Sequence, residues 1–364
     1  MESPLRAGIL GGGFMAEVHS RAIRAAGHEV IMISSSSPEK SAEAASRLGV
    51  RHVAADARRL VESESVDVVH VCTPNAFHAE QAELAIAVGK PVVCEKPLAT
   101  SVRDATNLVS RAAESKTPTA VPFVYRYYPA VREIRSRILR GDAGELHLLH
   151  GAYLQDWLAL PTATNWRVNE AVGGASRTFA DIGVHWCDAM EFVTGHRITR
   201  LVSLLARPHP ARGATEDSAS ILFETDRGAS GTLIASQISH GRKNQLAFSF
   251  DGELESFEWN QEHPGQFSAS TPNGSTNVNV GSVELAAASA QELAYLPAGH
   301  PQGYQDAFNA FMADAYASFQ GDVAPDLPTF EDGLRAAVIT EAVLQSAQSR
   351  QWVDVARVAA PAIH

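Results

Sequence analysis

Cysteine is scarce in this sequence, and long hydrophobic runs are absent. Three of the 364 residues are cysteine, and Cys72, Cys94 and Cys187 lie in apolar stretches without C-x-x-C spacing. This pattern indicates neither a disulfide framework nor a zinc site, so we expect buried thiols in a reducing compartment. No apolar run approaches the roughly 20 residues that span a bilayer. A strand-like run begins at Leu5, which leaves no room for a secretion signal, so we expect a cytoplasmic protein.

Positive charge is also scarce. Lysine and arginine number 30 against 41 acidic residues, the net charge is −11, and the basic residues form no block. Such a surface is poorly suited to a phosphate backbone or an anionic membrane. We therefore expect small molecules as partners, and neither nucleic acid nor membrane. A chain of this length predicts two domains.

The first third alternates short apolar runs with amphipathic stretches, which predicts strand-helix units and a parallel sheet. The expected strands are residues 5–10, 29–33, 66–72, 91–94 and 119–124. The expected helices are residues 14–26, 38–48, 77–88 and 102–115. Together they predict an α/β, doubly wound nucleotide-binding domain over residues 1–122.

The rest of the chain has a different pattern. Strand candidates follow one another from residue 146, which predicts an open, mainly antiparallel sheet in an α+β domain over residues 123–364. The expected strands are residues 146–154, 201–207, 218–224, 229–236 and 245–250. Expected helices are residues 180–194, 304–319 and 329–351, and residues 265–282 are expected to form an exposed loop or hairpin.

Gly11, Gly13 and Ala16 match the pattern G-x-G-x-x-G/A between the first expected strand and helix. The first glycine permits a tight turn, the second lets the backbone approach a pyrophosphate, and the small third residue lets helix and strand pack. The helix amides then face the anion, so Phe14 and Met15 join the expected dinucleotide contacts.

The second expected strand is followed by Ser34 and Ser35, where a carboxylate would bind a free ribose 2′-hydroxyl. Serine hydroxyls tolerate a 2′-phosphate and Lys40 can reach it, so NADP is slightly favoured over NAD. The alternative is that Lys40 is solvated and that the ribose of NAD lies on the serines.

Thr73, Pro74 and Asn75 follow an apolar strand at the carboxyl edge of the sheet, where ligands bind in open sheets. We expect them at the nicotinamide end of the cofactor, although the same tripeptide also forms ordinary turns. His78 and Glu95 are assigned to the cofactor site as well.

Glu95-Lys96-Pro97 places a lysine at the end of a strand. Partial burial beside a cationic nicotinamide disfavours the ammonium form, so Lys96 can exchange protons with a substrate. Pro97 constrains Lys96 toward extended geometry. The alternative is a surface ion pair between Lys96 and Glu95.

Asp181 and His185 are four residues apart, so in a helix a carboxylate and an imidazole share one face. The two side chains can bind the hydroxyls of one diol, and the pKa of histidine lies near neutral pH, where it can transfer the hydroxyl proton. A helix cap or a core pair is the alternative. No third ligand stands at a recognisable spacing, so a metal site is not predicted.

The glycine-rich loop, Glu95-Lys96-Pro97, the Gly173-Gly174 pair and the Asp-x-Gly-x-His segment stand in one order along the chain. In this order they resemble the Gfo/Idh/MocA family of NAD(P)-dependent sugar and inositol dehydrogenases, over nearly the whole length. The resemblance implies a Rossmann domain followed by an open-faced sheet domain for substrate and subunit contact. It also implies Lys96, Asp181 and His185 as the catalytic group, with His185 as acid/base and Lys96 bridging substrate and nicotinamide.

Other segments look like a branch that oxidises sugars or anhydrosugars, namely residues 125–129, 153–157, 165–167 and 299–304. The resemblance assigns substrate binding to Lys96, Arg126, Tyr153, Gln155, Trp157, Trp166, Asp181 and His185. Aromatic faces with amide and carboxylate groups suit a sugar ring. Trp157 and Trp166 serve equally well as sheet core.

These features predict an NAD(P)-dependent oxidoreductase. It transfers hydride between the cofactor and a secondary hydroxyl or ketone of a sugar, anhydrosugar or cyclic polyol, and forms a homodimer or homotetramer through the C-terminal sheet. One alternative is a redox-neutral, NAD-dependent glycoside hydrolase. Another is a non-catalytic dinucleotide-binding regulator, which ranks last because this chain keeps Lys96 and His185.

Overall fold

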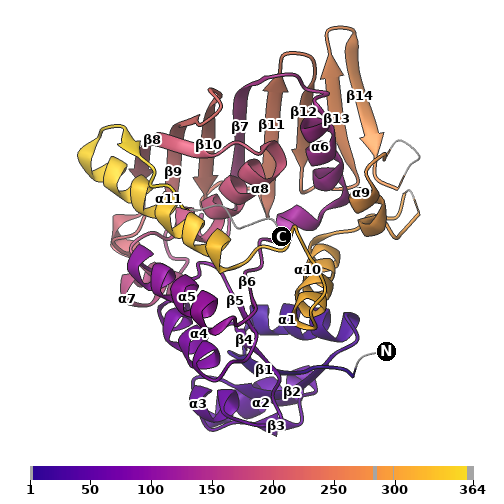
Figure 1. Cartoon of the computed structure of the whole chain (residues 1–364). Helices are drawn as coiled ribbons and strands as arrows, with labels where there is room; N and C mark the ends of the chain where they lie inside the picture. The colour runs from indigo at the N-terminus through magenta and orange to yellow at the C-terminus, as the bar shows by residue number, and fades with distance from the viewer. Residues whose placement is uncertain (1–2, 282–284, 298, 359–364) are drawn as a thin grey trace.

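The computed structural model describes residues 3–281, 285–297 and 299–358, which build two β-sheets with helices packed on them (Figure 1). The first sheet has six strands in the order β3-β2-β1-β4-β5-β6, and every pair is parallel. Its strands are β1 Arg6–Leu10, β2 Glu29–Ser34, β3 His52–Val53, β4 Val68–Val71, β5 Val92–Cys94 and β6 Thr119–Ala120. This is the doubly wound order of dinucleotide-binding sheets, so the predicted parallel sheet is confirmed.

The helices of this half agree closely with the sequence pattern. They are α1 Phe14–Ala25, α2 Pro38–Leu48, α3 Ala57–Val61, α4 His78–Ala87 and α5 Val102–Ser115. The side chains of Ser37 and Ser101 cap α2 and α5, and these two helices have the predicted bounds. The short β3 and α3 were not predicted. The expected strand 119–124 is shorter than predicted, because a 3-10 turn, Val124–Tyr127, replaces its end.

The second sheet has nine strands in the order β14-β13-β12-β11-β7-β10-β9-β8-β15. They are β7 Leu146–Leu154, β8 Ile198–Ala206, β9 Ser218–Thr225, β10 Ser230–Ser236, β11 Gln245–Gly252, β12 Ser256–Asn260, β13 Gln266–Thr271, β14 Gly274–Asn279 and β15 Val353–Asp354. The mainly antiparallel sheet is confirmed, with β7 and β10 as a parallel pair at its centre. The predicted hairpin is β13 and β14, while Ser282 lies outside the described residues.

The helices of the second half pack on this sheet and also return to the first one. They are α6 Pro129–Arg140, α7 Glu170–Gly173, α8 Val184–Thr194, α9 Ala288–Leu293, α10 Tyr304–Phe319 and α11 Phe330–Ser349. Helix α10 packs against α1 and α11 against α5, so the end of the chain joins the two sheets (Figure 1). Helix α6 was missed by the sequence pattern, as were α7, α9 and β12. Within the described residues, no helix has the length and apolar character that crossing a bilayer requires.

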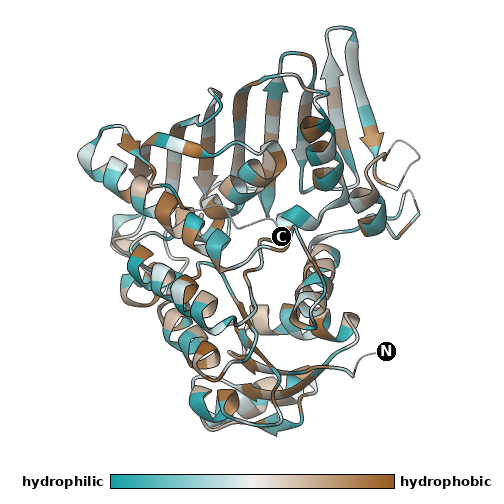
Figure 2. Ribbon diagram, viewed as in Figure 1, coloured by the Kyte–Doolittle hydropathy of each residue, from teal (hydrophilic) through white to brown (hydrophobic). Residues whose placement is uncertain are grey.

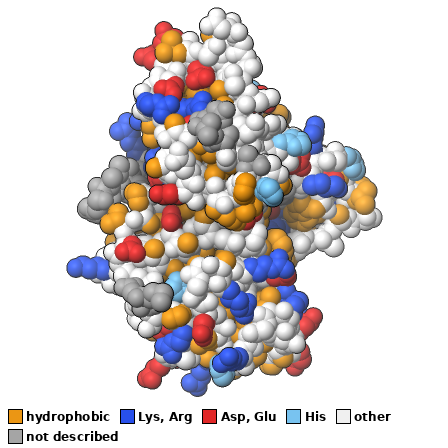
Figure 3. All heavy atoms as spheres, turned by 90° about the vertical axis from the view of Figure 1, so that its right-hand side faces the viewer, with side chains coloured by type: hydrophobic (Ala, Val, Ile, Leu, Met, Phe, Trp, Pro, Cys, Tyr) orange, Lys and Arg blue, Asp and Glu red, His pale blue; other side chains and the backbone are white. Residues whose placement is uncertain are grey.

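The hydrophobic interior lies along the first sheet and on the helix-covered face of the second. In Figure 2 hydrophobic colour follows the strands of the first sheet, and all four residues of β4 are buried. In β9, by contrast, every second side chain is exposed, so one face of the second sheet is uncovered in the single chain. On the side of the molecule shown in Figure 3, acidic and basic side chains are interspersed over the lower part, and hydrophobic side chains gather around the middle.

A glycine in β7 sets how closely α8 approaches the second sheet. The indole of Trp186 in α8 is fully buried, and its Nε1 donates to the carbonyl of Ala247 at 3.0 Å. A Cβ at Gly151 would lie 2.4 Å from that nitrogen and 2.2 Å from the Ala247 oxygen. Only glycine fits here. The close approach that it permits places α8, and with it His185, against the sheet.

We expect Gly151→Ala to destabilise the fold by about 1–3 kcal/mol, because the added methyl group overpacks the Trp186 contact. Urea unfolding measures the change. Gly265→Ala is the matched control, because a Cβ there meets no described atom within 4 Å. Equal stability of Gly151→Ala and the parent would contradict this account of α8 packing.

Candidate active site

Lys96 and Asp181 form an ion pair between the two halves of the chain. Lys96 follows β5, and its Nζ donates to Oδ1 of Asp181 at 2.9 Å and to the main-chain oxygen of Asp181 at 2.8 Å. The side chains are 13% and 16% exposed. Burial by itself raises the pKa of Asp181, but Lys96 and then Arg167 outweigh it and hold that pKa below its usual value. Asp181 is therefore ionised at neutral pH.

Asp181 lies in a π-helical turn, Phe179–Gly183, that continues directly into α8. Such turns are frequent at functional sites. Both oxygens of its carboxylate have partners: Arg167 Nε lies 3.4 Å from Oδ1, and Gln237 Nε2 donates to Oδ2 at 2.8 Å. The predicted helix over 180–194 is therefore present, but its first turn is wider than an α-helix.

His185 stands in the first turn of α8 and is 6% exposed. The rings of Phe123, Tyr125 and Tyr153 surround it, with centroids 5.7, 5.2 and 6.3 Å away. Burial, and then the positive charge of Lys96, lower the pKa of His185 well below its ordinary value, and Asp181 offsets this only in part. The imidazole is therefore neutral and can accept a proton. Its Nδ1 has no hydrogen-bond partner among the described residues.

A line of hydrogen bonds runs from the aromatic wall beside His185. The hydroxyls of Tyr125 and Tyr153 are 2.6 Å apart, and Tyr153 donates to Oδ1 of Asn244 at 2.7 Å. Gln155 Nε2 donates to the same oxygen at 2.8 Å, and Trp157 Nε1 donates to Oε1 of Gln155 at 2.7 Å. Three predicted residues, Tyr153, Gln155 and Trp157, are thus joined. Asn244 was missed, because no local motif marks it.

Trp166 and Arg126 have different surroundings. Trp166 is half-buried, and its ring lies 4.4 Å from the Arg167 guanidinium, next to the Lys96 pair. Arg126, which the resemblance assigned to substrate binding, is buried and forms ion pairs with Asp188 and Asp332. The buried carboxylates of Asp188 and Asp332 need a neighbouring positive charge, and the guanidinium of Arg126 supplies it.

The glycine loop has the shape that a pyrophosphate requires. Gly11 has φ +108°, and a Cβ on it would lie 2.4 Å from the carbonyl oxygen of Cys72. A Cβ on Gly13 would meet no described atom within 4 Å, and no described side chain caps the helix that begins at Phe14. The space beside Gly13 is therefore open, and the start of α1 has no described side-chain cap, as an anion site at a helix N-terminus needs. Met15 is half-buried against the core.

The region expected to bind the ribose contains no carboxylate from Ser34 to Ser37. Ser34 is buried, its carbonyl accepts from the amide of Gly11 at 2.7 Å, and Lys40 is exposed on α2. Ser35 is half-buried, and its amide donates to Ser41. Arg47 was missed by the sequence pattern; it donates to the carbonyl of Gly12 at 2.5 Å and pairs with Glu17.

The polar residues at the end of β4 brace neighbouring loops. Thr73 Oγ1 donates to Gln81 at 2.7 Å, and Asn75 Nδ2, just after Pro74, donates to the carbonyl of Gly173 at 2.8 Å. Both ring nitrogens of His78 contact carbonyl oxygens, those of Pro97 at 2.7 Å and Thr73 at 2.8 Å. These side chains stabilise the loops at the carboxyl edge of the sheet around Lys96. Both ring nitrogens of His78 lie against main-chain oxygens.

Glu95 belongs to a buried row of polar side chains. Its Oε1 lies 3.0 Å from Nε2 of His19, and its Oε2 accepts from the amide of Lys96 at 3.2 Å. The Nδ1 atoms of His19 and His70 are 2.9 Å apart, and His70 Nε2 lies 2.8 Å from the hydroxyl of Tyr316. The row therefore connects α1, β4, the residue after β5 and α10, and it ends at Glu95 next to Lys96.

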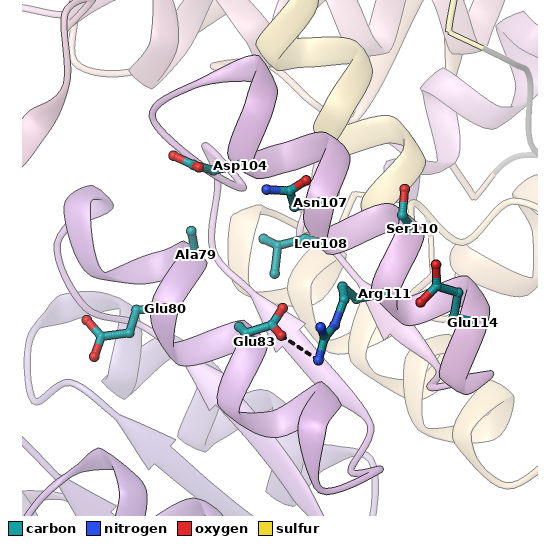
Figure 4. A pocket seen from close by; sticks show the side chains of 9 residues that line it. All are labelled: Ala79, Glu80, Glu83, Asp104, Asn107, Leu108, Ser110, Arg111 and Glu114. Carbon is teal, nitrogen blue, oxygen red and sulfur yellow. Dashed lines mark ion pairs between the residues drawn. The ribbon is translucent and has the colours of Figure 1, made fainter.

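A separate hollow of about 550 Å³ lies between α4 and α5 on the outer surface (Figure 4). Its lining includes Glu80, Glu83, Asp104, Arg111 and Glu114. Figure 4 shows Arg111 directed at Glu83, with which it forms an ion pair at 2.9 Å. None of the predicted site residues lines this hollow, so it is separate from the Lys96 group.

Known proteins resemble this chain in sequence and in fold. A levoglucosan dehydrogenase from Pseudarthrobacter phenanthrenivorans is 28% identical over 394 residues, covering 98% of this chain and 99% of that protein. A 1,5-anhydro-D-fructose reductase from Ensifer adhaerens is 28% identical, covering 96% and 98% of the two chains. The structure of a levoglucosan dehydrogenase in complex with NADH and L-sorbose superposes with a TM-score of 0.91 at 28% identity, covering 98% of this chain and 100% of that one.

Two family models match along the chain. One, described as an oxidoreductase family with an NAD-binding Rossmann fold, matches residues 5–123. The other, the Gfo/Idh/MocA C-terminal domain, matches residues 131–258. The chain therefore belongs to the Gfo/Idh/MocA family of oxidoreductases with an NAD-binding Rossmann fold.

Proposed function

We propose that this protein oxidises a secondary hydroxyl, or reduces the corresponding ketone, of a sugar, anhydrosugar or cyclic polyol. The observation that supports this best is the Lys96 ammonium, held by ionised Asp181 and close to a neutral, buried His185. The names of the two relatives, both acting on anhydrosugars, point to the same substrate class. When bound, a nicotinamide dinucleotide supplies the two-electron acceptor or donor.

The residues of the chain divide the remaining work. Lys96 donates two of its three N–H bonds to Asp181, so the third is free for the oxygen that reacts. Its positive charge stabilises negative charge that develops on that oxygen. His185 accepts the hydroxyl proton in oxidation and returns it in reduction. Tyr153, Gln155 and Trp157 offer polar atoms and ring faces for the rest of the sugar.

The two halves have separate tasks in this proposal. Residues 1–122 bind the dinucleotide through the Gly11–Gly13 turn and the first amides of α1. Residues 123–364 bind the substrate and the second subunit. Because no carboxylate stands from Ser34 to Ser37, we propose that the site accepts NADP as well as NAD, with Lys40 near the 2′-phosphate. The NADH in the related structure supports NAD. The three free cysteines support a cytoplasmic location.

The same scaffold serves the two alternatives. A redox-neutral glycoside hydrolase would oxidise its substrate transiently and end without net reduction of the cofactor. The named relatives are a dehydrogenase and a reductase, which favours net oxidation or reduction. A regulator without catalysis does not need the Lys96–Asp181 pair or the buried imidazole, and this chain has both.

A panel of anhydrosugars, sugars and inositols with NAD+ and NADP+ tests this function. We expect reduced cofactor to accumulate at 340 nm with one of these classes, and with both cofactors. Lys96→Met should lower turnover by about 10²- to 10⁴-fold, because the charge on the reacting oxygen loses its partner. NADH binding, measured by fluorescence, should survive.

The control for this experiment is Lys116→Met, at an exposed lysine that follows α5. It should keep the parent rate. Substrate cleavage without net cofactor reduction would favour the hydrolase, and an unchanged rate in Lys96→Met would remove Lys96 from the mechanism.

The lowered pKa of His185 predicts the pH dependence of oxidation. The folded pKa lies below the usual value of about 6.5, so the imidazole stays neutral until the pH falls below that value. The acid limb of kcat/KM should therefore lie below about pH 6.5. His185→Gln should lower the rate by about 10²- to 10⁴-fold and abolish this limb. An identical limb in parent and variant, measured from pH 5 to 9, would exclude His185 as the base.

The uncovered face of the second sheet supports subunit contact. Leu222 on β9 and Ile234 on β10 are 50% and 49% exposed, and Leu204 on β8 is 70% exposed. The register places all three on the same face, because Leu204 and Ile234 both pair with Ser220, two residues from Leu222. We propose that a second copy covers this face.

Leu222→Glu should therefore lower the molar mass in light scattering, because a charge in the contact cannot be desolvated without a partner. We expect the parent to be a dimer or tetramer. Val323→Glu, at a residue 80% exposed between α10 and α11, is the control and should leave the mass unchanged. A monomeric parent would contradict the proposed contact.

A further inference from the structure

Gln237 is a completely buried amide at the end of β10, and its side chain contacts the catalytic carboxylate. Its Nε2 lies 2.8 Å from Oδ2 of Asp181. An ionised carboxylate only accepts hydrogen bonds, so the amide nitrogen, rather than the amide oxygen, must face it. The orientation of Gln237 is therefore fixed by chemistry.

Gln237 holds the one Asp181 oxygen that Lys96 does not contact. Oδ1 accepts from Lys96 at 2.9 Å and lies 3.4 Å from Arg167, and Oδ2 has Gln237. With a partner on each oxygen, the plane of the carboxylate cannot rotate freely. Removal of the Gln237 amide leaves the charged, shielded Oδ2 of Asp181 without a hydrogen-bond donor. The carboxylate is then stabilised by turning toward another cation or toward water.

The backbone of Gln237 is itself anchored. Its amide donates to the carbonyl of Asp217 at 3.1 Å, and its own carbonyl accepts from the amide of Leu158 at 3.1 Å, just after Trp157. Gln237 thus lies between the start of β9 and the loop that follows the aromatic substrate residues. This anchoring makes the side chain a fixed reference point for Asp181.

A separate group holds the backbone that bears Asp181. The buried carboxylate of Glu216 accepts from Ser176 Oγ at 2.7 Å and from the amide of Phe179 at 2.9 Å, where the π-helical turn begins. Within the described residues, Gln237 contacts the same segment only through a side chain, since its Oε1 accepts from Thr178 Oγ1 at 3.3 Å. Glu216, by contrast, accepts from the main-chain amides of Arg177 and Phe179. Glu216 therefore fixes the main chain that bears Asp181, and Gln237 fixes the Asp181 carboxylate.

We propose that Gln237 is a positioning residue that sets the Asp181 carboxylate so that Lys96 keeps one N–H directed at the substrate. This inference rests on the proposed function, because Gln237 acts on the reaction through its contact with Asp181. It differs from a general packing role, since the amide donor, and not the volume of the side chain, is what the carboxylate requires.

Gln237→Met tests this directly, because methionine keeps the length and removes the donor. Loss of a hydrogen bond to a charged group predicts a fall of about 10- to 100-fold in kcat/KM. NADH affinity should stay within about twofold of the parent, since only the Asp181 side of the site changes. Gln237→Asn, which retains the amide on a shorter side chain, should show the same loss.

A double-mutant cycle separates positioning from packing. In an Asp181→Asn background, Gln237→Met should have little further effect on kcat/KM, because the group through which it acts is already altered. Gln261→Met is the control for replacing a glutamine of the same half; among the described residues its amide nitrogen donates to the hydroxyl of Tyr128. It should keep the parent kcat/KM, and thermal unfolding checks that each variant folds.

A crystal structure of Gln237→Met gives a readout that needs no activity. We expect the Asp181 carboxylate to rotate and Lys96 to leave its 2.9 Å contact with Oδ1. Parent kinetics together with an unmoved carboxylate would overturn the proposal, as would an equal loss in the Asp181→Asn background. Absence of activity in the parent on every substrate would defeat the proposed function alone, and the position of Asp181 in the variant would still decide the role of Gln237.

Discussion

The ion pair between Lys96 and Asp181 is the interaction on which the rest of this structure depends. It joins the carboxyl end of β5 in the first sheet to the turn before α8 on the second. Taking an ion out of water costs several kcal/mol, so a shielded pair is stable only when its other hydrogen bonds are satisfied. The main-chain oxygen of Asp181, Gln237 and Arg167 supply those contacts. The pair therefore requires both sheets to be in place at once.

The surroundings of the pair keep neighbouring groups in defined charge states. Burial lowers the pKa of His70 well below its ordinary value, so this ring is neutral. Burial also raises the pKa of Glu95, but the hydrogen bond from His19 and the neighbouring positive charge, Lys96 included, together outweigh it, and the net pKa is lowered. Tyr316, His70, His19 and Glu95 form one continuous row, with successive contacts of 2.8, 2.9 and 3.0 Å. An ionised Glu95 thus lies beside Lys96, while His185 on the other side is uncharged.

Sequence signals were sufficient where the chemistry is local. Ser37 before Pro38 predicts the start of α2, and the spacing of Gly11 and Gly13 predicts the loop that the structure shows. Helix α6 was missed although its buried Val131, Ile134 and Ile138 have helical spacing; it also buries Arg132 and Glu133. Its charges find partners only in the tertiary fold, as Arg132 does with Asp326.

The residues of the candidate site fall into the same two groups: those that a local motif predicts, and those that only the tertiary fold reveals. Lys96, Asp181 and His185 were predicted from motifs, and the fold brings them together. Gln237, just after β10, contacts Asp181, and Asn244, just before β11, contacts Tyr153; nothing in the neighbouring sequence marks either residue. Arg126 has a partner still farther along the sequence, Asp332, and pairs with it in the interior. Partners that lie far apart in sequence leave no local pattern, so only the three-dimensional structure reveals them.

A crystal structure with NAD+ and a non-reacting sugar analogue tests the central claim most directly. The account predicts that Lys96 Nζ keeps its contacts with Asp181 and donates its remaining hydrogen to a ring hydroxyl oxygen at about 3 Å. The nicotinamide should lie on the same side of the sugar as Lys96, with His185 within reach of that hydroxyl. A ternary complex in which Lys96 has turned away from both Asp181 and the sugar would contradict it.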